Sequence, residues 1–338
     1  MNKTVLQRVI SGERLSRLEM DRWLTSVVSG QEPEVVVSAV LATMSYRGES
    51  VSELSGALDA LKRVMIPFPS GSFGPLFDTC GTGGDGKGSF NISTTVAIVL
   101  AAGGIPVVKH GGRAVSSRSG SADVLEALGI QVDLPVERSL EIFSELGIVF
   151  LWAPLYHPAL KGLAPLRRSL QIRTLFNMIA PLANPAGVSR QMLGVSSEAL
   201  VVPMAELLLS HGSKEFIVMC GQGLDEATLE GRTIFAIGRG GEIQEGALMP
   251  GDFGLPLAPV SAISGGDCFE NASIVRRVLA GEEGPYLDYV LANAALGFQI
   301  TGHADSPLDG VRIAREVVMS GRGEELLNRW RDLCQTRS

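Results

Sequence analysis

The sequence predicts an α/β protein built as a small all-helical N-terminal domain followed by a larger α/β domain with a central, largely parallel sheet flanked by helices. Two observations support this fold class. Helix-start signals and separating glycines fill the first 66 residues. Beyond them, short apolar runs typical of strands alternate with helical stretches, which is the pattern of a parallel sheet joined by crossover helices.

Helical signals fill residues 1–66, which we expect to form the N-terminal domain. Ser16 and Ser50 are each followed three residues later by a glutamate, which is the capping-box pattern of a helix start. Pro33 suits a first helical turn. The helical stretches are separated by three glycines, Gly12, Gly30 and Gly48. A linker rich in proline and glycine then leads into the second domain, residues 67–338.

The second domain contains the strand-like runs. After a first strand that leads into Gly81, they lie at residues 105–108, 130–134, 148–151, 191–195, 216–220 and 233–237. One helix is expected to begin near Asn91, Ser93 and Thr94, which offer capping oxygens, and to end at Gly103. Another is expected to include residues 124–128. Residues 267–330 are predicted to form helices that cover the sheet.

Composition indicates a compact protein and argues against several functions. Of the 338 residues, 45% are apolar, which is enough for a large core, and the net charge is -7. Such an acidic chain lacks the basic surface of a general nucleic-acid binder. The start of the chain has no secretory apolar region, and the four cysteines form no C-x-x-C pair. We therefore expect a cytoplasmic protein with reduced thiols and with neither a membrane nor a nucleic-acid partner.

Small, hydroxyl and basic residues gather in four clusters, at 81–85, 91–94, 109–113 and 116–121. Each cluster follows a predicted strand or opens a predicted helix, where an open parallel sheet gathers its ligand-binding loops. Glycine amides, hydroxyl groups and helix N-termini favour an anion, and Lys109 adds a cation. One glycine turn would be ordinary structure, but four successive clusters predict a phosphate-binding site.

The glycine cluster also matches other nucleotide-binding patterns. The string from Gly81 to Gly86 is a G-x-G-x-x-G sequence, as in dinucleotide-binding folds, which place an acidic residue about 20 residues later. Here that position carries Lys109 and His110, and a cofactor with a 2'-phosphate would tolerate these bases, so this alternative stays open. A P-loop is excluded because no Gly-Lys-Ser or Gly-Lys-Thr follows the glycines.

Two further pairs of charged residues are candidate functional residues. Asp225 and Glu226 follow the strand-like run 216–220, and a loop after a strand can turn two carboxylates toward one point, as Mg²⁺ sites with substrate phosphates require. A solvated acidic pair at a helix start is the alternative. Arg167 and Arg168 lie on a predicted helix, where arginine pairs are more often a surface feature.

The ordered motifs resemble one known family. The segments 78–85, 91–94, 109–113, 116–123, 156–159, 164–168, 173–177, 181–185, 223–226, 265–267 and 270–272 resemble those of the anthranilate phosphoribosyltransferases of tryptophan biosynthesis. The resemblance covers nearly the whole chain. It implies an enzyme, a pentosyltransferase that moves the 5-phosphoribosyl group from 5-phosphoribosyl 1-diphosphate to the amine of anthranilate and releases diphosphate.

The resemblance also implies which residues form the site, with Mg²⁺ as the cofactor. The residues expected to bind 5-phosphoribosyl 1-diphosphate are Gly81, Gly84, Asp85, Ser89, Asn91, Ile92, Ser93, Thr94, Lys109, His110, Gly111, Gly112, Arg113, Ser116, Ser117 and Ser121. Those expected to bind the acceptor are Gly81, His110, Gly112 and Arg167, and those expected to bind the metal are Ser93, Asp225 and Glu226. No general acid or base is assigned, because the aniline nitrogen is already neutral and nucleophilic.

The family further implies a homodimer formed through the helical domain and an active site at the hinge between the two domains. It also implies that segments near residues 160–190 complete the helical domain.

One departure from the family motif bears on the acceptor. The family has an asparagine where this chain has Gly112, and loss of that amide removes a polar contact worth about 0.5–1.5 kcal/mol. Two alternatives therefore stay open. One is a paralogue that phosphoribosylates a different aromatic acid or amine. The other is a non-catalytic nucleic-acid-binding relative, against which the acidic balance and the retained Asp225 and Glu226 argue.

Overall fold

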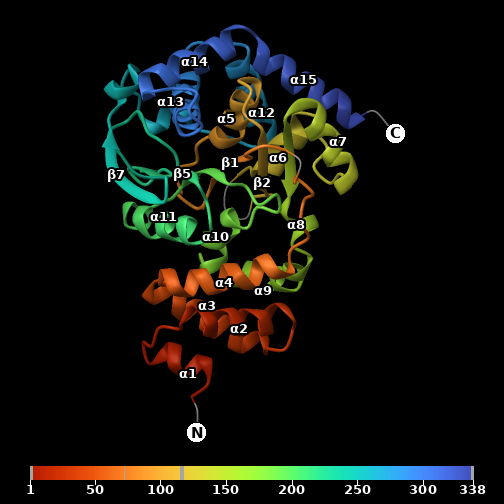
Figure 1. The fold of residues 1–338 in the computed structure, drawn as a ribbon, viewed down its shortest axis with the longest axis vertical. Helices are drawn as coiled ribbons and strands as arrows, with labels where there is room; N and C mark the ends of the chain where they lie inside the picture. The colour runs from red at the N-terminus through yellow and green to blue at the C-terminus, as the bar shows by residue number, and fades with distance from the viewer. Residues whose placement is uncertain (1–2, 72, 115–117, 336–338) are drawn as a thin grey trace.

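The computed structural model describes residues 3–71, 73–114 and 118–335 and shows two stacked parts (Figure 1). Four N-terminal helices form the lower part in that view, and an α/β body lies above them. The N-terminus lies at the free end of the helical part, and the C-terminus follows the last helix of the α/β body. Within the described ranges, no helix is both long enough and apolar enough to span a membrane.

The helical part consists of α1 (Val5–Ile10), α2 (Arg17–Val28), α3 (Glu34–Arg47) and α4 (Val51–Val64). Both predicted capping boxes are confirmed. The hydroxyls of Ser16 and Ser50 each accept the amide N–H three residues on, and Glu19 and Glu53 reach back to the cap. Pro33 is the N-cap of α3, one residue before the expected first turn. Local signals therefore determine where these helices begin.

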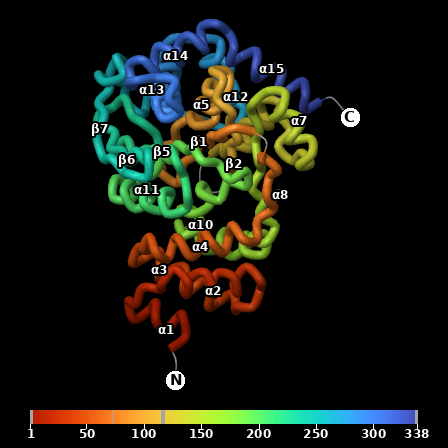
Figure 2. Tube along the Cα trace, in the orientation of Figure 1, coloured from red at the N-terminus to blue at the C-terminus, as the bar shows by residue number. Residues whose placement is uncertain are grey.

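Later segments of the chain pack against these helices. They are the 3-10 helix η1 (Pro158–Leu163), α9 (Ala164–Leu170), α10 (Leu175–Ile179) and the 3-10 helix η2 (Ala180–Leu182). Figure 2 shows α10 beside α4. Leu41 and Leu58 share a buried cluster with Phe176. The Ser45 hydroxyl donates a hydrogen bond of 2.7 Å to the carbonyl of Arg173. The chain between β3 and β4 is thus anchored on the helical part.

A seven-stranded sheet forms the centre of the α/β body. Its strands are β1 (Phe77–Gly81), β2 (Val107–Gly111), β3 (Ile148–Trp152), β4 (Arg190–Gly194), β5 (Glu215–Gly221), β6 (Thr233–Arg239) and β7 (Glu242–Leu248). Their order is β3-β2-β1-β4-β5-β6-β7, in which the first five strands run parallel and β6 and β7 are antiparallel to their neighbours. The predicted fold class is confirmed.

Helices cover both faces of this sheet. On one face lie α5 (Ile92–Ala102), α12 (Cys268–Leu279), α13 (Pro285–Ile300), α14 (Pro307–Met319) and α15 (Arg322–Gln335) (Figure 1). There the side chains of Val107 and Ile217 join the main core. On the other face, Leu193 and Val218 pack with α11 (Val201–Ser210) and the helical part. The helices predicted at 124–128 and 267–330 are confirmed, since α6 (Ser121–Ala127) and α12–α15 occupy these stretches.

The remaining elements are α7 (Val136–Leu146), an eleven-residue helix that packs against β3, and the short connections α8 (Ala153–Tyr156), η3 (Glu198–Leu200), η4 (Pro250–Phe253) and η5 (Val260–Ile263).

Two strand predictions differ from the structure. Residues 130–134 are not a strand, although Ile130 and Val132 are buried. They follow α6 and pack into the core beside the sheet, whose edge position is already taken by β3. Strand β7 was not expected, because its largely polar and exposed residues give a weak strand signal. It pairs with β6 through the turn at Gly240 and Gly241, whose φ angles are 61° and 87°.

The strand order places a crevice at β1. The chain moves outward from β1 to β2 and β3 and then crosses to β4 on the other side of β1. Ligands of open parallel sheets bind outside the carboxyl ends of the strands at such a reversal point. The expected site therefore lies beyond Gly81 and Gly194, the last residues of β1 and β4.

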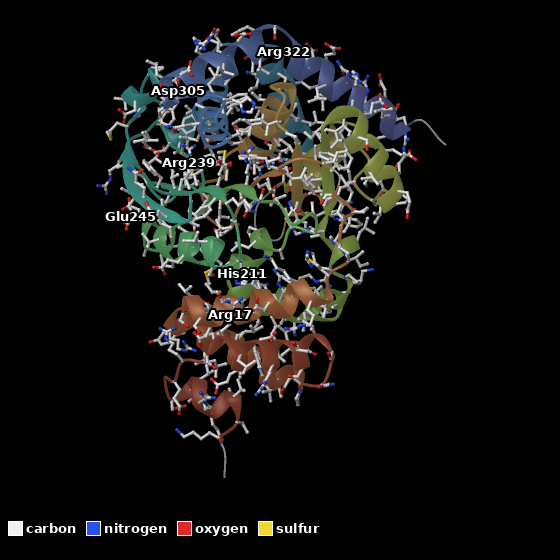
Figure 3. All side chains as sticks on the ribbon, in the orientation of Figure 1. Arg17, His211, Arg239, Glu245, Asp305 and Arg322 are labelled. Atoms are coloured by element: carbon white, nitrogen blue, oxygen red, sulfur yellow. The ribbon has the colours of Figure 1, made fainter. Side chains whose placement is uncertain are left out.

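A polar contact joins α4 to the end of α11. His211 Nε2 lies 3.1 Å from Ser55 Oγ, and burial lowers the pKa of His211 to about 4, so the ring is neutral at pH 7. One turn along α4, Asp59 accepts a hydrogen bond of 2.8 Å from Arg17. Figure 3 labels Arg17 and His211 where the helical part meets the α/β body. The Ser55–His211 contact therefore reinforces the apolar packing between the two parts, while Arg17 and Asp59 join α2 to α4.

Glu53 is a buried ionic anchor of the helical part. Its carboxylate pairs with Arg47 and Arg14 and accepts the amide N–H of Leu15 at 2.9 Å. Burial alone would raise the pKa of Glu53, but Arg47 and the backbone amides outweigh it and lower the pKa to about 2. Because this pKa lies below the ordinary value of 4.5, the carboxylate stabilises the fold fully above pH 4.5, and this contribution is lost as the pH falls toward 2.

We expect Glu53→Gln to lower the free energy of unfolding at pH 7 by about 3 kcal/mol, since each pKa unit is worth about 1.4 kcal/mol. The difference from wild type should shrink as the pH falls from 4.5 toward 2. Urea unfolding at several pH values measures this. Glu198→Gln, which breaks an exposed ion pair with Arg232, is the control and should change little. If the decrease in the free energy of unfolding of Glu53→Gln did not vary with pH, the assignment of Glu53 as an ionised anchor would be wrong.

Candidate active site

A single cavity of about 320 Å³ lies at the carboxyl ends of β1 and β2 and against the loop after β5. The residues predicted for the site that line it are Gly81, Gly84, Asp85, Ser89, Asn91, Ile92, Ser93, Thr94, Lys109, His110, Gly111, Gly112, Arg113, Ser121, Asp225 and Glu226. Ser116 and Ser117 lie outside the described residues. Arg167 is not part of the lining. The structure thus brings together segments that are up to 145 residues apart in the sequence.

The glycine-rich loop after β1 forms one wall of the cavity. Gly83 and Gly84 have φ angles of 64° and 68°, which side chains with a Cβ rarely adopt. Arg173 holds this loop from the side of the helical part, because its guanidinium donates to Thr82 Oγ1 at 3.1 Å and to Ser196 Oγ. The loop is therefore fixed by its backbone conformation and by a single long side chain.

Helix α5 opens the second wall, but it begins differently from the prediction. Asn91 is the N-cap residue, yet its side chain does not cap the helix. Instead, Asn91 Nδ2 donates to the carbonyl of Ser119 at 3.2 Å, and Asn91 Oδ1 accepts from Asn271 Nδ2 at 2.9 Å. The expectation that Asn91 supplies a capping oxygen is wrong, because Ser119 in the loop before α6 and Asn271 on α12 occupy both of its polar atoms. The positive end of α5 therefore faces the cavity without a side-chain cap.

The acidic loop after β5, which carries Asp225 and Glu226, forms a third wall of the cavity. Asp225 Oδ2 accepts the amide N–H of Gly83 at 2.9 Å. Three strand ends must be glycine for this approach, because a Cβ at Gly81, Gly194 or Gly221 would overlap atoms of the loop. Burial, with the nearby charge of Asp85, raises the pKa of Asp225 to about 7. Burial and then the charge of Asp225 also raise the pKa of Glu226 well above its usual range.

Two buried carboxylates in one loop are costly unless a cation joins them. The Ser93 backbone amide lies against the Glu226 carboxylate, so the three predicted metal ligands are neighbours. In the part of the chain that the structure describes, no three His, Cys, Asp or Glu side chains form a complete metal site. This pattern fits Mg²⁺, which commonly takes one or two carboxylates and completes its shell with substrate phosphates and water.

Lys109 lies at the floor of the cavity. Its Nζ donates to the carbonyl of Thr79 and lies 3.4 Å from Ser93 Oγ. Burial lowers the pKa of Lys109, and the neighbouring Asp78 opposes this effect. Asp78 is itself fully buried, which raises its pKa to about 6. The ammonium group is thus part of a buried charge network beneath the cavity. It does not extend freely into the cavity.

Several buried polar atoms along the cavity wall have no hydrogen-bond partner among the described residues. They are Asp85 Oδ2, Thr94 Oγ1, His110 Nε2 and Ser119 Oγ. Buried polar groups in folded proteins are normally paired. Burial lowers the pKa of His110 to about 3, so the ring is neutral at pH 7. Because its other nitrogen bonds to the backbone of Ala180, the unpaired Nε2 is an acceptor. Four such atoms around one cavity indicate a polar ligand that supplies both donors and acceptors.

Arg167 lies behind the cavity wall, on α9. Its guanidinium carbon is 5.3 Å from the centre of the Phe176 ring, and it forms no ion pair with any described residue. Asn177, the neighbour of Phe176, does line the cavity. Burial lowers the pKa of Arg167. A half-buried guanidinium without an anionic partner is a candidate site for a carboxylate.

Arg113 differs from a free phosphate-binding cation. Its guanidinium pairs with Asp123 at 3.1 Å and with Glu126, and it lies 5.6 Å from the Trp152 ring centre. It therefore lines the cavity while being held at its rim.

Some cavity residues were missed from the sequence. They include Thr82, Gly83, Phe90, Ser119, Gly120 and Asn177. All except Phe90 lie inside the motif segments that carried the resemblance, so the signal was present in the sequence. Phe90 is an apolar residue next to Asn91, and nothing in its local pattern distinguishes it from a core residue.

Comparison with known proteins identifies the family. A glycosyl transferase family a/b domain model matches residues 74–324, and a glycosyl transferase family helical bundle domain model matches residues 3–65. Over 326 residues the chain is 42% identical to the anthranilate phosphoribosyltransferase of Listeria monocytogenes, covering 96% of this chain and 95% of that one. The chain belongs to the anthranilate phosphoribosyltransferase family. An anthranilate phosphoribosyltransferase of Rhodopseudomonas palustris is also 42% identical, over 97% of this chain and 96% of its own.

Solved structures of anthranilate phosphoribosyltransferases have the same fold. The crystal structure of the Thermus thermophilus enzyme superposes with a TM-score of 0.91 at 41% identity, covering 98% of this chain and 99% of that one. The Saccharomyces cerevisiae enzyme in complex with PRPP and Mg has a TM-score of 0.84 at 26% identity, covering 97% and 96%. No feature of the described cavity favours the dinucleotide, alternative-acceptor or nucleic-acid-binding interpretations over this family.

Two glycines of this anthranilate phosphoribosyltransferase family site offer a matched test of the geometry. A Cβ at Gly81 would overlap the Asp225 carboxylate, whereas among the described residues no atom lies within 4 Å of a Cβ placed at Gly112. We expect Gly81→Ala to lower kcat/KM by about 100-fold, because it displaces a group that must be positioned to within about 1 Å. Gly112→Ala should change kcat/KM by less than about threefold, as expected for a side chain that meets no described neighbour. Steady-state kinetics of both variants measures this, and equal effects would contradict the packing of the acidic loop.

Proposed function

We propose that this protein transfers the 5-phosphoribosyl group of 5-phosphoribosyl 1-diphosphate to the amine of anthranilate and releases diphosphate. The observation that carries the proposal is one cavity in which a glycine-rich loop, an uncapped helix start and two buried carboxylates face one another. These groups suit a diphosphate accompanied by a divalent cation. The yeast relative is described in complex with PRPP and Mg, and we extend both ligands to this chain.

In this proposal, Asp225 and Glu226, with Ser93, would hold Mg²⁺. When bound, the ion supplies positive charge that stabilises the departing diphosphate. The raised pKa of Asp225 and Glu226 reflects burial and repulsion, both of which a divalent cation at this point would offset. The neighbouring amide of Ser93 keeps Glu226 oriented toward the start of α5.

The chain would act by positioning and by charge. The bond between the anomeric carbon and the diphosphate oxygen breaks, its electron pair leaves with diphosphate, and the amine nitrogen forms the new bond from the opposite face. The nitrogen then releases one proton to the departing diphosphate or to water. Amides of the glycine-rich loop and the start of α5, with the unpaired hydroxyl of Thr94, would hold the leaving group. His110 Nε2, neutral and unpaired, would accept a hydrogen bond from the amine. No residue is proposed as a general acid or base.

The acceptor would lie between Gly81, His110 and Gly112 on one side and Arg167 on the other. The anthranilate carboxylate would be the anionic partner that Arg167 lacks among the described residues. Gly112 leaves open space beside the aromatic ring.

The direct test is an assay with Mg²⁺, 5-phosphoribosyl 1-diphosphate and anthranilate. We expect anthranilate fluorescence to decline as an equal amount of diphosphate appears, and both signals to require Mg²⁺. If a panel of other aromatic acids and amines released diphosphate while anthranilate did not, the acceptor assignment would be wrong. If no acceptor gave diphosphate, the transferase assignment would fall.

Arg167 and its neighbour Arg168 form a matched pair for the acceptor site. We expect Arg167→Ala to raise KM for anthranilate by roughly 10- to 100-fold, since hydrogen bonds to charged groups are worth about 1.5–3 kcal/mol. KM for 5-phosphoribosyl 1-diphosphate should stay within about twofold, because Arg167 is outside the lining of the diphosphate cavity. Arg168→Ala, at an exposed position, should leave both constants unchanged. The opposite ranking of the two variants would reject Arg167 as the carboxylate ligand.

We also propose the organisation expected from the family. Residues 1–66 with segments near 160–190 would form one domain and residues 67–338 the other, with the active site at the hinge. The protein would work in the cytoplasm as a homodimer joined through the helical domain. The support for the dimer is the exposure of large apolar side chains on the helical part. They are Ile10, Leu18, Val35 and Tyr46, of which Tyr46 is 94% exposed.

Val35 and Tyr46 lie eleven residues apart on α3, which is about three helical turns, so they share one side of the helix. We expect Val35→Glu combined with Tyr46→Glu to convert a dimer into a monomer, measured by light scattering after size-exclusion chromatography. Leu308→Glu, at an exposed apolar position on α14, is the control and should stay dimeric. A wild-type monomer, or a dimer that survives the α3 changes, would contradict the proposed interface.

A further inference from the structure

We propose that Asn271 on α12 is a positioning residue that keeps the start of α5 free for diphosphate by holding the side chain of Asn91 away from it. The inference rests on the proposed function, since it concerns how that site binds its leaving group. It adds a residue outside the lining of the 320 Å³ cavity and assigns it a specific effect.

A chain of three hydrogen bonds links Asn271 to both sides of the cavity. Asn271 Oδ1 accepts the amide N–H of Gly266 at 2.8 Å. Asn271 Nδ2 donates to Asn91 Oδ1 at 2.9 Å, and Asn91 Nδ2 donates to the carbonyl of Ser119 at 3.2 Å. Backbone groups fix the direction at both ends, because an N–H can only donate and a carbonyl can only accept. The orientation of both asparagine amides is therefore determined, and Asn91 must present its oxygen to Asn271.

This orientation removes the usual cap of α5. Asparagine at an N-cap normally accepts an amide N–H from the first turn, and it is among the best residues for that purpose. Here no such bond forms, whereas α2, α4 and α12 all have side-chain caps. The Asn91 oxygen is already taken by Asn271. In the first turn of this eleven-residue helix, the Ile92 N–H donates to the carbonyl of Phe90, and the Ser93 N–H faces Glu226. The Thr94 amide is thereby left for a ligand.

A second observation indicates that a ligand belongs there. Thr94, in the same first turn, is only 2% exposed, lines the cavity, and its hydroxyl has no partner among the described residues. A buried hydroxyl without a partner beside an uncapped helix start indicates a polar ligand that pairs with both.

The position of Asn271 is itself tightly determined. Asn271 is 2% exposed, and a Cβ at Gly265 would come within 2.8 Å of its Oδ1, so a glycine is needed for this approach. Its own helix does not need it as a cap, because Asp267 accepts the N–H groups of Phe269 and Glu270. Its Oδ1 holds the Gly266 amide in the loop before α12, and its Nδ2 is directed across to Asn91 at the start of α5.

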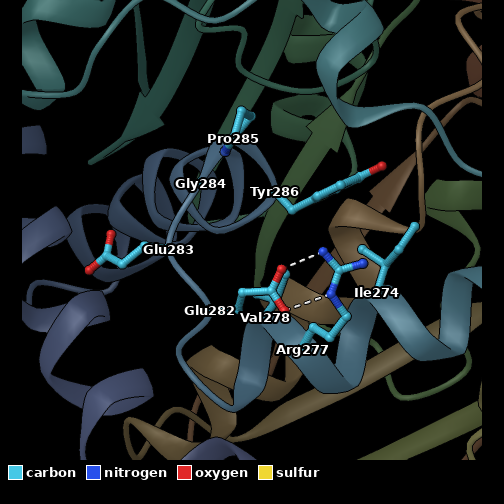
Figure 4. A pocket seen from close by; sticks show the side chains of 8 residues that line it. All are labelled: Ile274, Arg277, Val278, Glu282, Glu283, Gly284, Pro285 and Tyr286. Carbon is cyan, nitrogen blue, oxygen red and sulfur yellow. Dashed lines mark hydrogen bonds and ion pairs between the residues drawn. The ribbon is translucent and has the colours of Figure 1, made fainter.

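Contacts beside α12 hold the backbone next to Asn91. The cavity in Figure 4 lies there, where Arg277 and Glu282 are joined by a two-pronged ion pair and Tyr286 forms one wall. Tyr286 donates to the carbonyl of Ser264 at 2.9 Å and packs edge-on against Phe90 at 5.2 Å between ring centres. Phe90 directly precedes Asn91, so the backbone that carries Asn91 is held from behind.

If Asn271 is shortened, Asn91 is free to turn and cap α5, and the cap then competes with diphosphate. We expect Asn271→Ala to weaken binding of Mg²⁺-diphosphate by roughly 3- to 30-fold, which matches the range of N-cap energies. Isothermal titration calorimetry on the full-length protein measures the affinity. In kinetics, KM for 5-phosphoribosyl 1-diphosphate should rise by the same factor, while kcat changes by less than about twofold.

A double-mutant cycle separates this effect from a general structural one. With Asn91→Ala already present, there is no cap to form, so adding Asn271→Ala should cause no further loss of Mg²⁺-diphosphate affinity. Asn271→Leu, which fills the site without a donor or an acceptor, should behave like Asn271→Ala. Ser306→Ala removes the cap of the distant α14 and controls for lost stability, and it should leave the affinity unchanged.

The outcomes distinguish the two proposals. If Asn271→Ala weakens binding of Mg²⁺-diphosphate equally in the wild-type and Asn91→Ala backgrounds, or does not weaken it at all, this inference is overturned. The proposed transferase function is then unaffected. If the wild-type protein neither binds Mg²⁺-diphosphate nor releases it from 5-phosphoribosyl 1-diphosphate, both proposals fall.

Discussion

The structure depends on one costly arrangement, the burial of Asp225 and Glu226 against the carboxyl ends of the central strands. Glycines at 81, 194 and 221 are needed for this approach, because a Cβ at any of them would overlap the acidic loop. Burial raises the pKa of both carboxyls, so the arrangement disfavours their charged form until a cation is present. A fold that keeps two such groups together, beside a glycine-rich loop and an uncapped helix, fits the metal and the diphosphate that we propose as its ligands.

The remaining elements hold the parts of this site in place. The reversal of strand order at β1 creates the crevice, and Arg173 ties the glycine-rich loop toward the helical part. On the opposite wall, α12 controls the side chain at the start of α5 through Asn271. Because the helical part and the sheet share a buried cluster, a displacement of either would move residues that line the cavity.

Much of this could be predicted from the sequence, because local signals determine it. The capping boxes at Ser16 and Ser50 and the end of the first strand at Gly81 depend on neighbouring residues, and the ordered motifs gave most of the cavity lining. What could not be predicted depends on partners far along the chain. Asn91 does not cap its helix because of Asn271, 180 residues away. Likewise, whether the apolar residues 130–134 form a strand depends on which strand occupies the sheet edge, not on their own pattern.

The most direct test of the central claim is the position of a metal ion in crystals grown with 5-phosphoribosyl 1-diphosphate and Mn²⁺ in place of Mg²⁺. The anomalous signal of manganese locates the ion independently of the protein density. The account predicts a peak at bonding distance from the carboxylates of the acidic loop and from diphosphate oxygens that reach the start of α5. A diphosphate bound in another cavity, or a metal that contacts neither Asp225 nor Glu226, would contradict it.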